Sequence, residues 1–434
     1  MGIMLRRLLL NMQRAVAAPS RNPRLAVVIG RLLATAFLVC FGTGLYSHFL
    51  QEPLPWMHFP TQPSNLYQYT QGIHITAGIA CFPLLFGKLY TVFPNLFETP
   101  PITGIGSLLA RASIAVFVGA SLVEITIGLL NTFQFYPWPF GFREVHFALS
   151  FVIIGSLAIH IAVKLPIIAR YWRKRDGYRP EVSFDADEQS ALDAPLIDVP
   201  RPVLGTPLEP VASKVASQAS GLTGRVFAWI DGTPRPQPRT SRRTFLATVG
   251  ASVAAVVLLT AGQSFAVLKP FNVFAPREKG IGPNQVPVNR TAMAAQVTDT
   301  AMDAAWALRI TNGTTTVAFT RAELLAMPQT TVNLPIACVE GWSQMATWSG
   351  VRLHDLVGRV APDGAALRIT SLEKEGGYRV TQMGSEYVSD LSTLVALTLN
   401  GETLDIDHGY PARMIAPGRP GVLQTKWLDH VEVM

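Results

Sequence analysis

Five long apolar runs constrain what this chain can fold into more than any other feature of its sequence. They cover about Leu25–Phe49, Tyr69–Phe93, Ile105–Leu130, Val145–Ala169 and Ala247–Leu268. A hydrocarbon core of about 30 Å requires roughly 20 helical residues, and each run is long enough. Because 49% of the residues are hydrophobic and only 15% are charged, the chain is expected to cross a lipid bilayer several times rather than to be an ordinary soluble protein.

Basic residues set the expected orientation of these spans. Lysine and arginine concentrate on the cytoplasmic side of a membrane. Those that flank or enter the spans are Arg24, Arg31, Lys88, Arg111 and the cluster Arg170-Tyr-Trp-Arg-Lys-Arg175. The opposite loops, Gln51–Asn65 and Asn131–Arg143, are rich in aromatic residues and proline, as expected at an outer interface. The net charge of +7 is therefore attributed to membrane topology, and no nucleic-acid partner is expected.

The remaining composition predicts the order of the domains. Residues 1–24 are expected to form a cytoplasmic N-terminus, and residues 25–175 a four-helix transmembrane domain. Residues 176–240 are rich in Pro, Ser and Ala with few large apolar residues, so they cannot bury a core and are predicted to be a disordered cytoplasmic linker. Residues 269–434 have a globular composition and are predicted to form an extracytoplasmic domain.

An arginine pair stands directly before the fifth run, in Thr240-Ser-Arg-Arg-Thr-Phe-Leu246. This segment resembles a twin-arginine export signal placed inside the chain. Residues 241–268 would then be an uncleaved signal-anchor helix. The twin-arginine route moves folded proteins, so the resemblance implies that the following domain acquires a cofactor before export. The alternative is a basic pair of the kind that precedes many membrane helices.

Four histidines lie inside or at the ends of the apolar runs: His48, His74, His146 and His160. Ionisable residues within a membrane are costly and are candidates for function. His146 and His160 lie on nearly the same face of a helix, separated by roughly 21 Å. The predicted topology puts the other two, with His146, near the outer face.

This arrangement resembles the b-type cytochrome subunits of formate dehydrogenases and hydrogenases, in which histidines of a four-helix bundle hold haem. The resemblance implies His74 and His146 as axial ligands of an outer haem b. His48 is an alternative ligand or a propionate partner. His160 is a possible ligand of a second haem, which would need an unusual partner such as Lys88; otherwise it forms hydrogen bonds within the bundle. Glu124 handles protons for a quinone or pairs with a polar neighbour.

Cys338 is the only cysteine outside the apolar N-terminal half. Its thiol is a buried small apolar group, a nucleophile or a metal ligand. The surrounding segments, in order, are Ile336–Leu353, Ser371–Arg379, Leu399–Leu404, Asp407–Gly421 and Thr425–Trp427. Together they resemble the molybdopterin-binding domain of the sulfite oxidase family, and its shorter bacterial, membrane-partnered members in particular.

The resemblance implies roles for individual residues. The Cys338 thiolate would bind molybdenum, which suits a soft sulfur ligand. Tyr378 and Arg379 would face the metal as further catalytic residues. Residues expected to bind the cofactor phosphate or an anionic substrate are Asn289, Arg290, His408, Arg413, Arg419, Thr425 and Lys426. Each basic residue taken alone could equally be a surface charge or a partner in an ion pair. Trp342 and Trp348 are expected in the core.

The expected fold is multi-domain. An all-α transmembrane bundle of four helices plus a fifth anchor helix precedes an α+β, β-rich, sulfite-oxidase-like molybdopterin domain. Short β-branched runs predict strands at Ala307–Ile310, Thr314–Phe319, Thr330–Leu334, Leu367–Thr370, Ala396–Leu399 and His430–Val433. Arg321–Ala326 and Arg352–Val360 are predicted to be short helices.

The expected function is that of a molybdopterin-dependent oxidoreductase in a bacterial cell membrane, with several spans and an extracytoplasmic C-terminal domain. Its cofactors would be molybdenum-molybdopterin and at least one haem b. Its partners would be the lipid bilayer, a quinone or another membrane redox donor or acceptor, and a small oxo-anion or S-oxide. Two alternatives stay open: a sulfite-type oxidase with the opposite electron flow, and a non-enzymatic haem membrane protein with a degenerate binding domain.

Overall fold

The computed structural model describes residues 9, 16, 18, 20–97, 102, 104–173, 241–274, 277–361 and 365–434. The predicted linker, 176–240, and most of the predicted N-terminal segment, 1–24, lie outside these ranges. The chain divides into two compact units. One comprises Met1–Thr35, Cys81–Glu124 and Ala148–Val253, and the other comprises Ala36–Ala80, Ile125–Phe147 and Ala254–Met434.

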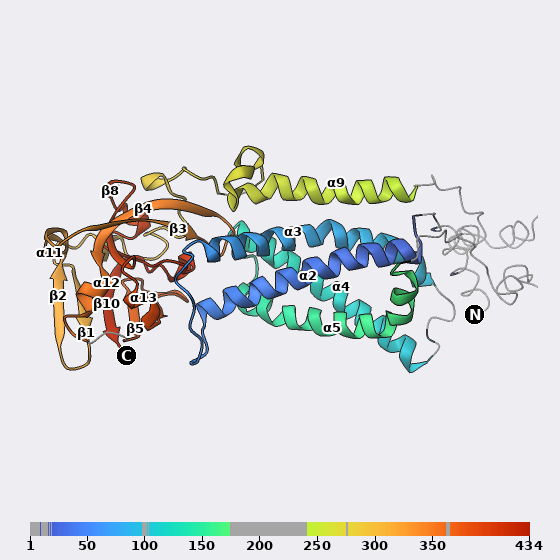
Figure 1. Ribbon diagram of the computed structural model, residues 1–434, viewed down its shortest axis with the longest axis horizontal. Coiled ribbons are helices and arrows are strands. Elements are labelled where there is room, and N and C mark those ends of the chain that lie inside the picture. The colour runs from blue at the N-terminus through green and yellow to red at the C-terminus, as the bar shows by residue number, and fades with distance from the viewer. Residues whose placement is uncertain are drawn as a thin grey trace, which may run out of the picture. The chain divides into compact units, whose positions relative to one another are not determined.

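Within the described ranges, five helices are long and apolar enough to cross a membrane. They are α2 (Pro23–Gln51), α3 (Leu66–Val92), α4 (Ile105–Thr132), α5 (Phe142–Tyr171) and α9 (Arg242–Thr260) (Figure 1). The five predicted apolar runs are thus confirmed as helices. A 3-10 turn, η1 (Phe93–Phe97), follows α3.

The fifth helix ends earlier than the sequence predicted. α9 stops at Thr260, and two 3-10 turns, η2 (Ala261–Gln263) and η3 (Ala266–Phe271), replace the predicted helix up to Leu268. Here the backbone of Gly262 approaches that of Leu268 so closely that a Cβ atom on Gly262 would lie 2.5 Å from the Leu268 carbonyl oxygen. Only a residue without a side chain tolerates that approach.

Two five-stranded sheets form the β-rich region. The first has the order β2-β1-β10-β5-β6, with β1 and β10 parallel and the other pairs antiparallel. The second has the order β3-β4-β7-β8, and β9 also pairs with β7; all its pairs are antiparallel. The strands are β1 (Ala307–Thr311), β2 (Thr316–Thr320), β3 (Thr330–Ala337), β4 (Ser343–Arg352), β5 (Leu367–Ser371), β6 (Val380–Met383), β7 (Leu394–Leu399), β8 (Glu402–Thr403), β9 (Arg413–Ile415) and β10 (Leu428–Val433).

The second sheet is buried on both faces. Successive side chains of a strand point to opposite faces, and β7 uses both. Val395 and Leu397 join the core shared with the first sheet, which includes Leu308 and Val431. Leu394 and Ala396 face the other way, into the cluster that contains Cys338. Leu399 also joins this cluster, because the register shift between β4 and β7 leaves an extra residue in β7 and reverses the alternation. The candidate site is therefore built on a strand layer that is packed from both sides.

Short helices complete the region. Among them α11 (Arg321–Ala326) starts with a capping box, in which Thr320 and Glu323 exchange side chain–backbone hydrogen bonds. The others are α10 (Thr298–Ala301), α12 (Leu353–Val357), α13 (Ser385–Ser389), η4 (Pro283–Gln285), η5 (Ile406–His408) and η6 (Gly421–Leu423).

The predicted strands and short helices are found, but four strands were not predicted: β4, β6, β8 and β9. β4 alternates irregularly between buried and exposed residues, and its register with β7 shifts between Ser349 and Gly350. β8 and β9 have only two and three residues. Neither an irregular strand nor one this short carries the period-2 pattern on which strand prediction depends.

The shared core yields a test of stability. Leu397→Ala removes a fully buried side chain between the two sheets, so the free energy of unfolding should fall by about 2–5 kcal/mol. Leu325→Ala on α11, where the leucine is 44% exposed, is the matched control and should change it by less than about 1 kcal/mol. Denaturant unfolding of the two variants measures the difference, and equal losses would contradict the packing described.

Candidate functional site

Cys338 lies in the short loop that joins β3 to β4. The loop is closed by two backbone hydrogen bonds: the Cys338 amide donates to the Trp342 carbonyl at 2.9 Å, and the Gly341 amide donates to the Cys338 carbonyl at 3.1 Å. Gly341 has φ +99°, a conformation that strongly favours glycine. Cys338 is 1% exposed. Burial, with the nearby Glu340 carboxylate, raises the pKa of its thiol well above the ordinary value.

Two buried basic residues, Arg413 on β9 and Lys426, interact electrostatically with the thiol. His408, at the end of η5, is also buried and lies next to Arg413, which donates a hydrogen bond to its carbonyl. Burial lowers the pKa of Arg413 to about 9, and the opposite effect of Cys338 offsets part of this. Burial and Arg413 together lower the pKa of Lys426 to about 7, again partly offset by Cys338. Burial, Arg413 and Lys426 lower the pKa of His408 to about 3, so its imidazole is neutral at pH 7.

Backbone carbonyls hold these side chains in place. The Lys426 ammonium donates to the carbonyls of Asp407 at 2.7 Å and Arg290 at 2.9 Å. Arg413 Nη1 donates to the His408 carbonyl at 3.1 Å, and His408 Nε2 donates to the Val286 carbonyl at 3.0 Å. Within the described part of the chain, Arg413 Nε has no acceptor. A buried guanidinium donor without a partner is costly, and an anionic group would satisfy it.

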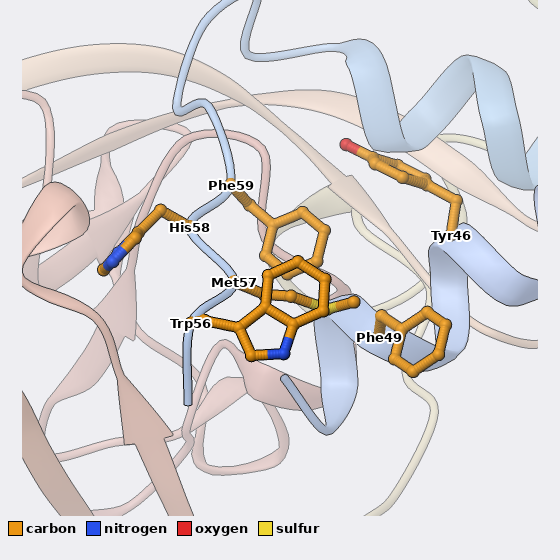
Figure 2. Close-up of a pocket in the computed structure, with 6 residues that line it drawn as sticks. All are labelled: Tyr46, Phe49, Trp56, Met57, His58 and Phe59. Atoms are coloured by element: carbon orange, nitrogen blue, oxygen red, sulfur yellow. The ribbon is translucent and has the colours of Figure 1, made fainter. Parts of the chain in front are cut away.

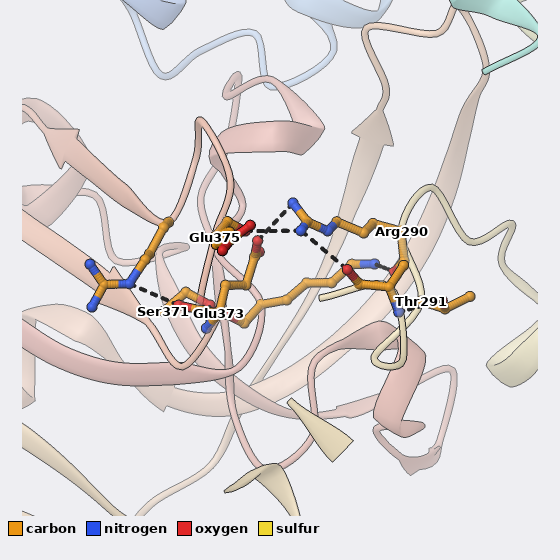
Figure 3. A network of polar contacts seen from close by, with 8 residues as sticks. Arg290, Thr291, Ser371, Glu373 and Glu375 are labelled. Carbon is orange, nitrogen blue, oxygen red and sulfur yellow. Dashed lines mark hydrogen bonds and ion pairs between the residues drawn. The ribbon is translucent and has the colours of Figure 1, made fainter. Parts of the chain in front are cut away.

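Arg290 joins a second network on the segment that follows β5 (Figure 3). Its guanidinium lies 3.0 Å from the Glu373 carboxylate and donates to the Glu375 carbonyl at 2.9 Å. Arg379 donates to the Glu373 carbonyl at 2.8 Å, and its side chain is otherwise exposed. Burial raises the pKa of Glu373, which Arg290 partly counters. The Arg290 carbonyl thus accepts a hydrogen bond from Lys426 of the site, whereas the Arg290 side chain belongs to this second network.

Other predicted residues make further contacts, and one of them, Tyr378, lies close enough to Cys338 for the two groups to interact electrostatically. Arg419 donates to the carbonyls of Leu423 and Gln382 and stacks over Tyr387 at 5.5 Å. Burial lowers the pKa of Arg419 to about 10, and Tyr387 and Glu386 are the groups that counter this. The buried Thr425 hydroxyl pairs with that of Thr381 at 3.1 Å. The Tyr378 hydroxyl donates to Gln51 at 2.6 Å.

Glu340 is a site residue that sequence reasoning missed. It is 6% exposed, and burial raises the pKa of its carboxyl group. Trp342 Nε1 donates to it at 3.1 Å, Gln134 also donates to it, and Arg277 Nε lies 3.9 Å away. Gln134, which adopts φ +54°, also donates to the Asn289 carbonyl at 2.6 Å. The only sequence signal was an acidic residue two positions after the cysteine inside an otherwise apolar segment.

Two of the predicted histidines are brought together. The rings of His74 on α3 and His146 on α5 have centroids 6.1 Å apart and planes at 73°. His74 Nδ1 lies 2.9 Å from the Cys40 carbonyl, an arrangement that fixes the imidazole and assigns the Nδ1 proton to that bond. Two glycines face the rings: Cβ atoms on Gly44 and Gly128 would lie 3.0 Å from His74 Cε1 and 3.4 Å from His146 Cε1.

The other two histidines have different surroundings. His48 stacks on Phe147, with ring centroids 3.7 Å apart. His160 belongs to the other compact unit, where its Nδ1 atom has no hydrogen-bond partner among the described residues. Lys88 of that unit donates to the Ala26 carbonyl at 2.6 Å. The described residues contain no group of three or more His, Cys, Asp or Glu side chains that could hold a metal ion together.

An aromatic cavity of about 400 Å³ adjoins the end of α2. Tyr46 and Phe49 from α2 and the loop residues Trp56–Phe59 line it (Figure 2). Figure 2 shows His58 pointing away from the other five side chains. Its Nδ1 atom lies 3.5 Å from the Glu386 carboxylate. The cavity therefore offers aromatic surface and the Tyr46 hydroxyl.

Comparison with known families identifies the domain that contains the buried thiol. Residues 294–434 match the family described as oxidoreductase molybdopterin binding domain. The C-terminal region is a molybdopterin-binding domain. The expectation of a molybdenum-dependent oxidoreductase is thereby confirmed at the level of this domain. The match covers the β-rich region and includes Cys338, His408, Arg413 and Lys426.

Three curated proteins are similar to parts of this chain. A nitrate reductase (NADPH) of Phytophthora infestans is 33% identical over 94 residues, covering 20% of this chain and 10% of the relative. Sulfite oxidase of Arabidopsis thaliana is 38% identical over 63 residues, 14% of this chain and 16% of the relative. A protein of Azospira oryzae named "Putative protein-methionine-sulfoxide reductase subunit YedZ1" is 27% identical over 120 residues, 26% of this chain and 42% of the relative.

A solved structure is also similar in sequence. The sulfane dehydrogenase SoxCD of Paracoccus pantotrophus is 25% identical, with a TM-score of 0.28, over 30% of this chain and 38% of that chain. The chain thus spans less than half the length of each of these four proteins.

The residues of the molybdopterin-binding domain fit such a cofactor. Cys338 offers one buried sulfur, and a bound metal ion would favour its thiolate over the thiol that burial alone favours. Arg413 and Lys426 offer buried positive charge, and Arg413 Nε lacks an acceptor in the described structure. A phosphate-bearing cofactor supplies the negative charge that these groups require.

Lys426 generates a prediction for pH dependence. Its folded-state pKa of about 7 lies below the ordinary 10.5, so between these values the folded state binds fewer protons than the unfolded state. The unfolding free energy of the cofactor-free protein should therefore rise with pH in this window, by up to about 1.4 kcal/mol per pH unit from this residue.

The test of this prediction is denaturant unfolding of cofactor-free protein between about pH 7 and pH 10. In Lys426→Met that contribution should be missing, so stability should rise less with pH. Lys374→Met, at an exposed lysine, is the matched control and should keep the wild-type slope. A Lys426→Met slope equal to that of the wild type would contradict the pKa assigned to Lys426.

Proposed function

We propose that this protein is a membrane-bound molybdopterin-dependent oxidoreductase that transfers an oxygen atom to or from a small oxo-anion or S-oxide. In this proposal, a b haem relays electrons between the domain and the quinone pool or another membrane redox partner. The observation that carries the proposal is the buried Cys338 thiol, which interacts electrostatically with the buried basic residues Arg413 and Lys426, within the molybdopterin-binding domain. A thiolate and convergent cations are what this cofactor requires.

The chain's own residues would divide the work as follows. Cys338 would bind molybdenum, which, when bound, supplies two-electron oxygen-atom chemistry. Arg413 and Lys426 would hold the anionic end of the cofactor. Further residues would line the cofactor site or hold its lining in place: Asn289, Arg290, His408, Arg419 and Thr425. Tyr378 and Arg379 would lie toward the substrate side. The burial of Cys338 would exclude bulk water from the ligand sulfur.

The histidine pair supports the haem part of the proposal. The His74 and His146 rings have centroids 6.1 Å apart, which is close enough for both imidazoles to hold one b haem, whose iron would supply one-electron transfer. Gly44 and Gly128 have no side chains, and any side chain at these two positions would contact the rings. His48 and His160 are kept as possible ligands, His160 for a second, inner haem.

The membrane placement rests on the five apolar helices and on the charges that flank them. Basic residues beside the predicted inner ends and the arginine pair at the start of α9 support a bacterial cell membrane location with the molybdopterin-binding domain outside the cytoplasm. The aromatic cavity beside α2 offers surface for a quinone ring.

The direction of electron flow separates two versions of this function. Relatives of the domain include enzymes named as nitrate reductases and as a sulfite oxidase, and the Azospira relative is named as a subunit of a methionine-sulfoxide reductase. We propose the reductive direction. Methionine sulfoxide and nitrate should then oxidise the reduced haem, whereas a sulfite-type oxidase would reduce the oxidised haem when sulfite is added. A visible spectrum recorded after each addition decides between them.

Cys338→Ser tests the molybdenum site. The substitution removes the soft sulfur ligand while keeping a small polar side chain, so turnover with a reduced dye as donor should fall by more than about a hundredfold. The haem absorbance should stay at the wild-type level. Cys81→Ser, at a cysteine in the apolar half, is the matched control and should keep turnover. Turnover retained in Cys338→Ser would reject the thiolate assignment.

His74→Ala tests the haem ligands. Loss of one axial imidazole should remove or convert the low-spin b haem spectrum, while molybdenum content and dye-driven turnover remain. His58→Ala is the matched control because the His58 side chain is 73% exposed in the loop after α2, and its spectrum should match the wild type. A wild-type protein with neither haem nor molybdenum would refute the function as a whole.

A further inference from the structure

The helix that carries His74 also holds the loop that carries Cys338. The side-chain amide of Gln71 on α3 donates to the Val339 carbonyl at 3.1 Å, and Val339 follows Cys338 directly. One turn further along α3, Ile75 packs against Gly341, where a Cβ atom would lie 3.0 Å from Ile75 Cγ1. Both contacts lie within one compact unit of the chain.

The contact extends along one face of α3. Tyr67, Gln71 and Ile75 are spaced by four residues, which places them on one side of a helix. Tyr67 is 1% exposed and clusters with Ala337, the last residue of β3, and with Leu50. Gln71 is 6% exposed. This face of α3 therefore contacts residues from Ala337 to Gly341, on both sides of Cys338.

A second segment supports the same loop. The Ser264 hydroxyl donates to the Gly341 carbonyl, and the Ser343 hydroxyl donates to the Ser264 carbonyl at 3.0 Å. Gly72 of α3 leaves room for this segment, because a Cβ atom there would lie 2.9 Å from Phe265. The loop is thus held between α3 and the residues that follow α9.

We propose that Gln71 and Ile75 are positioning residues that dock the Cys338 loop on α3 and couple the haem site to the molybdenum site. This inference rests on the proposed function. Ile75 follows His74 in the chain, and Val339 follows Cys338. The Gln71–Val339 hydrogen bond and the Ile75–Gly341 contact therefore connect the segments that carry the two ligand residues.

In the reductive direction, the coupled sites would transfer two electrons from the donor to the S-oxide or oxo-anion. A quinol gives up two electrons and releases two protons to the solvent as it becomes a quinone, and the electrons cross the α3 contact one at a time. The substrate takes up these two electrons and two protons from the solvent and loses one oxygen atom, which leaves as water. The donor loses two electrons, and the substrate gains two.

The test uses the full-length protein with Gln71→Ala and Ile75→Ala combined, which removes both contacts. Haem absorbance, molybdenum content and dye-driven turnover should stay at wild-type levels. The rate at which methionine sulfoxide or nitrate oxidises the reduced haem should fall by at least roughly tenfold, because the variant removes the contacts that position the Cys338 loop on the helix of His74. A general loss of structure would lower dye-driven turnover as well.

A second readout is independent of turnover. In full-length protein made without the molybdenum cofactor, Cys338 is 1% exposed and should react slowly with iodoacetamide. Releasing the loop from α3 should speed this reaction by at least roughly tenfold, measured on the Cys338 peptide by mass spectrometry. Thr76→Ala is the matched control. Its hydroxyl donates to the Gly72 carbonyl within α3, so both rates should stay at wild-type values.

The outcomes are distinguishable. If both the haem oxidation rate and the Cys338 alkylation rate are unchanged in the double variant, the coupling proposal is overturned while the proposed function stands. If the double variant loses its haem, the same measurements are made on Gln71→Leu, which removes only the hydrogen bond to Val339. The same results then support or overturn the proposal. Wild-type haem that responds to neither methionine sulfoxide, nitrate nor sulfite would count against the proposed function itself.

Discussion

A thiol and two cations buried together are the constraint on which the molybdopterin-binding domain depends. Burying an unpaired charge is expensive, and removing cations from water without a partner costs several kcal/mol per ion. Cys338, Arg413 and Lys426 are each no more than 7% exposed. Because of this cost, burial lowers the pKa values of Arg413 and Lys426 and raises the pKa of Cys338. The arrangement makes sense for a site completed by an anionic, metal-bearing group.

The fold supplies the rigidity that such a site needs. Cys338 stands in the loop of a hairpin whose sheet is packed on both faces, so the strands at both ends of the loop are fixed. Backbone carbonyls of Asp407 and Arg290 orient Lys426, and that of His408 orients Arg413. Carbonyl acceptors fix the direction of each cation without neutralising its charge. The positive charge therefore remains available to a bound anion.

Residues far apart in the sequence complete the surroundings of the thiol. Gln134 and Arg277 both reach Glu340, and Gln71 reaches Val339. In separate subunits, contacts of this kind would depend on association and its entropy. In one polypeptide they are intramolecular, which raises the effective concentration of one partner near the other. The proposed coupling between His74 and Cys338 draws on this covalent connection.

Local patterns in the sequence account for most of the secondary structure. Five helices follow from apolar runs of sufficient length, and most strands follow from β-branched segments between turns, because hydropathy and propensity act over neighbouring residues. The identity of the Cys338 region followed from its ordered motifs. Local patterns also gave the His74 and His146 positions, though not their separation.

The tertiary structure shows which of the predicted residues come together. It brings Arg413 and Lys426 within electrostatic reach of Cys338, with His408 beside Arg413. It also places the Arg419 guanidinium over the Tyr387 ring and stacks His48 on Phe147. It added Glu340, whose partners Gln134 and Arg277 carry no local signal, and strands as short as β9. It ended α9 at Thr260, where backbone approach at Gly262 turns the chain. The physical reason is the same throughout: these features depend on contacts between distant segments, which side-chain volume and backbone geometry settle and which no local periodicity records.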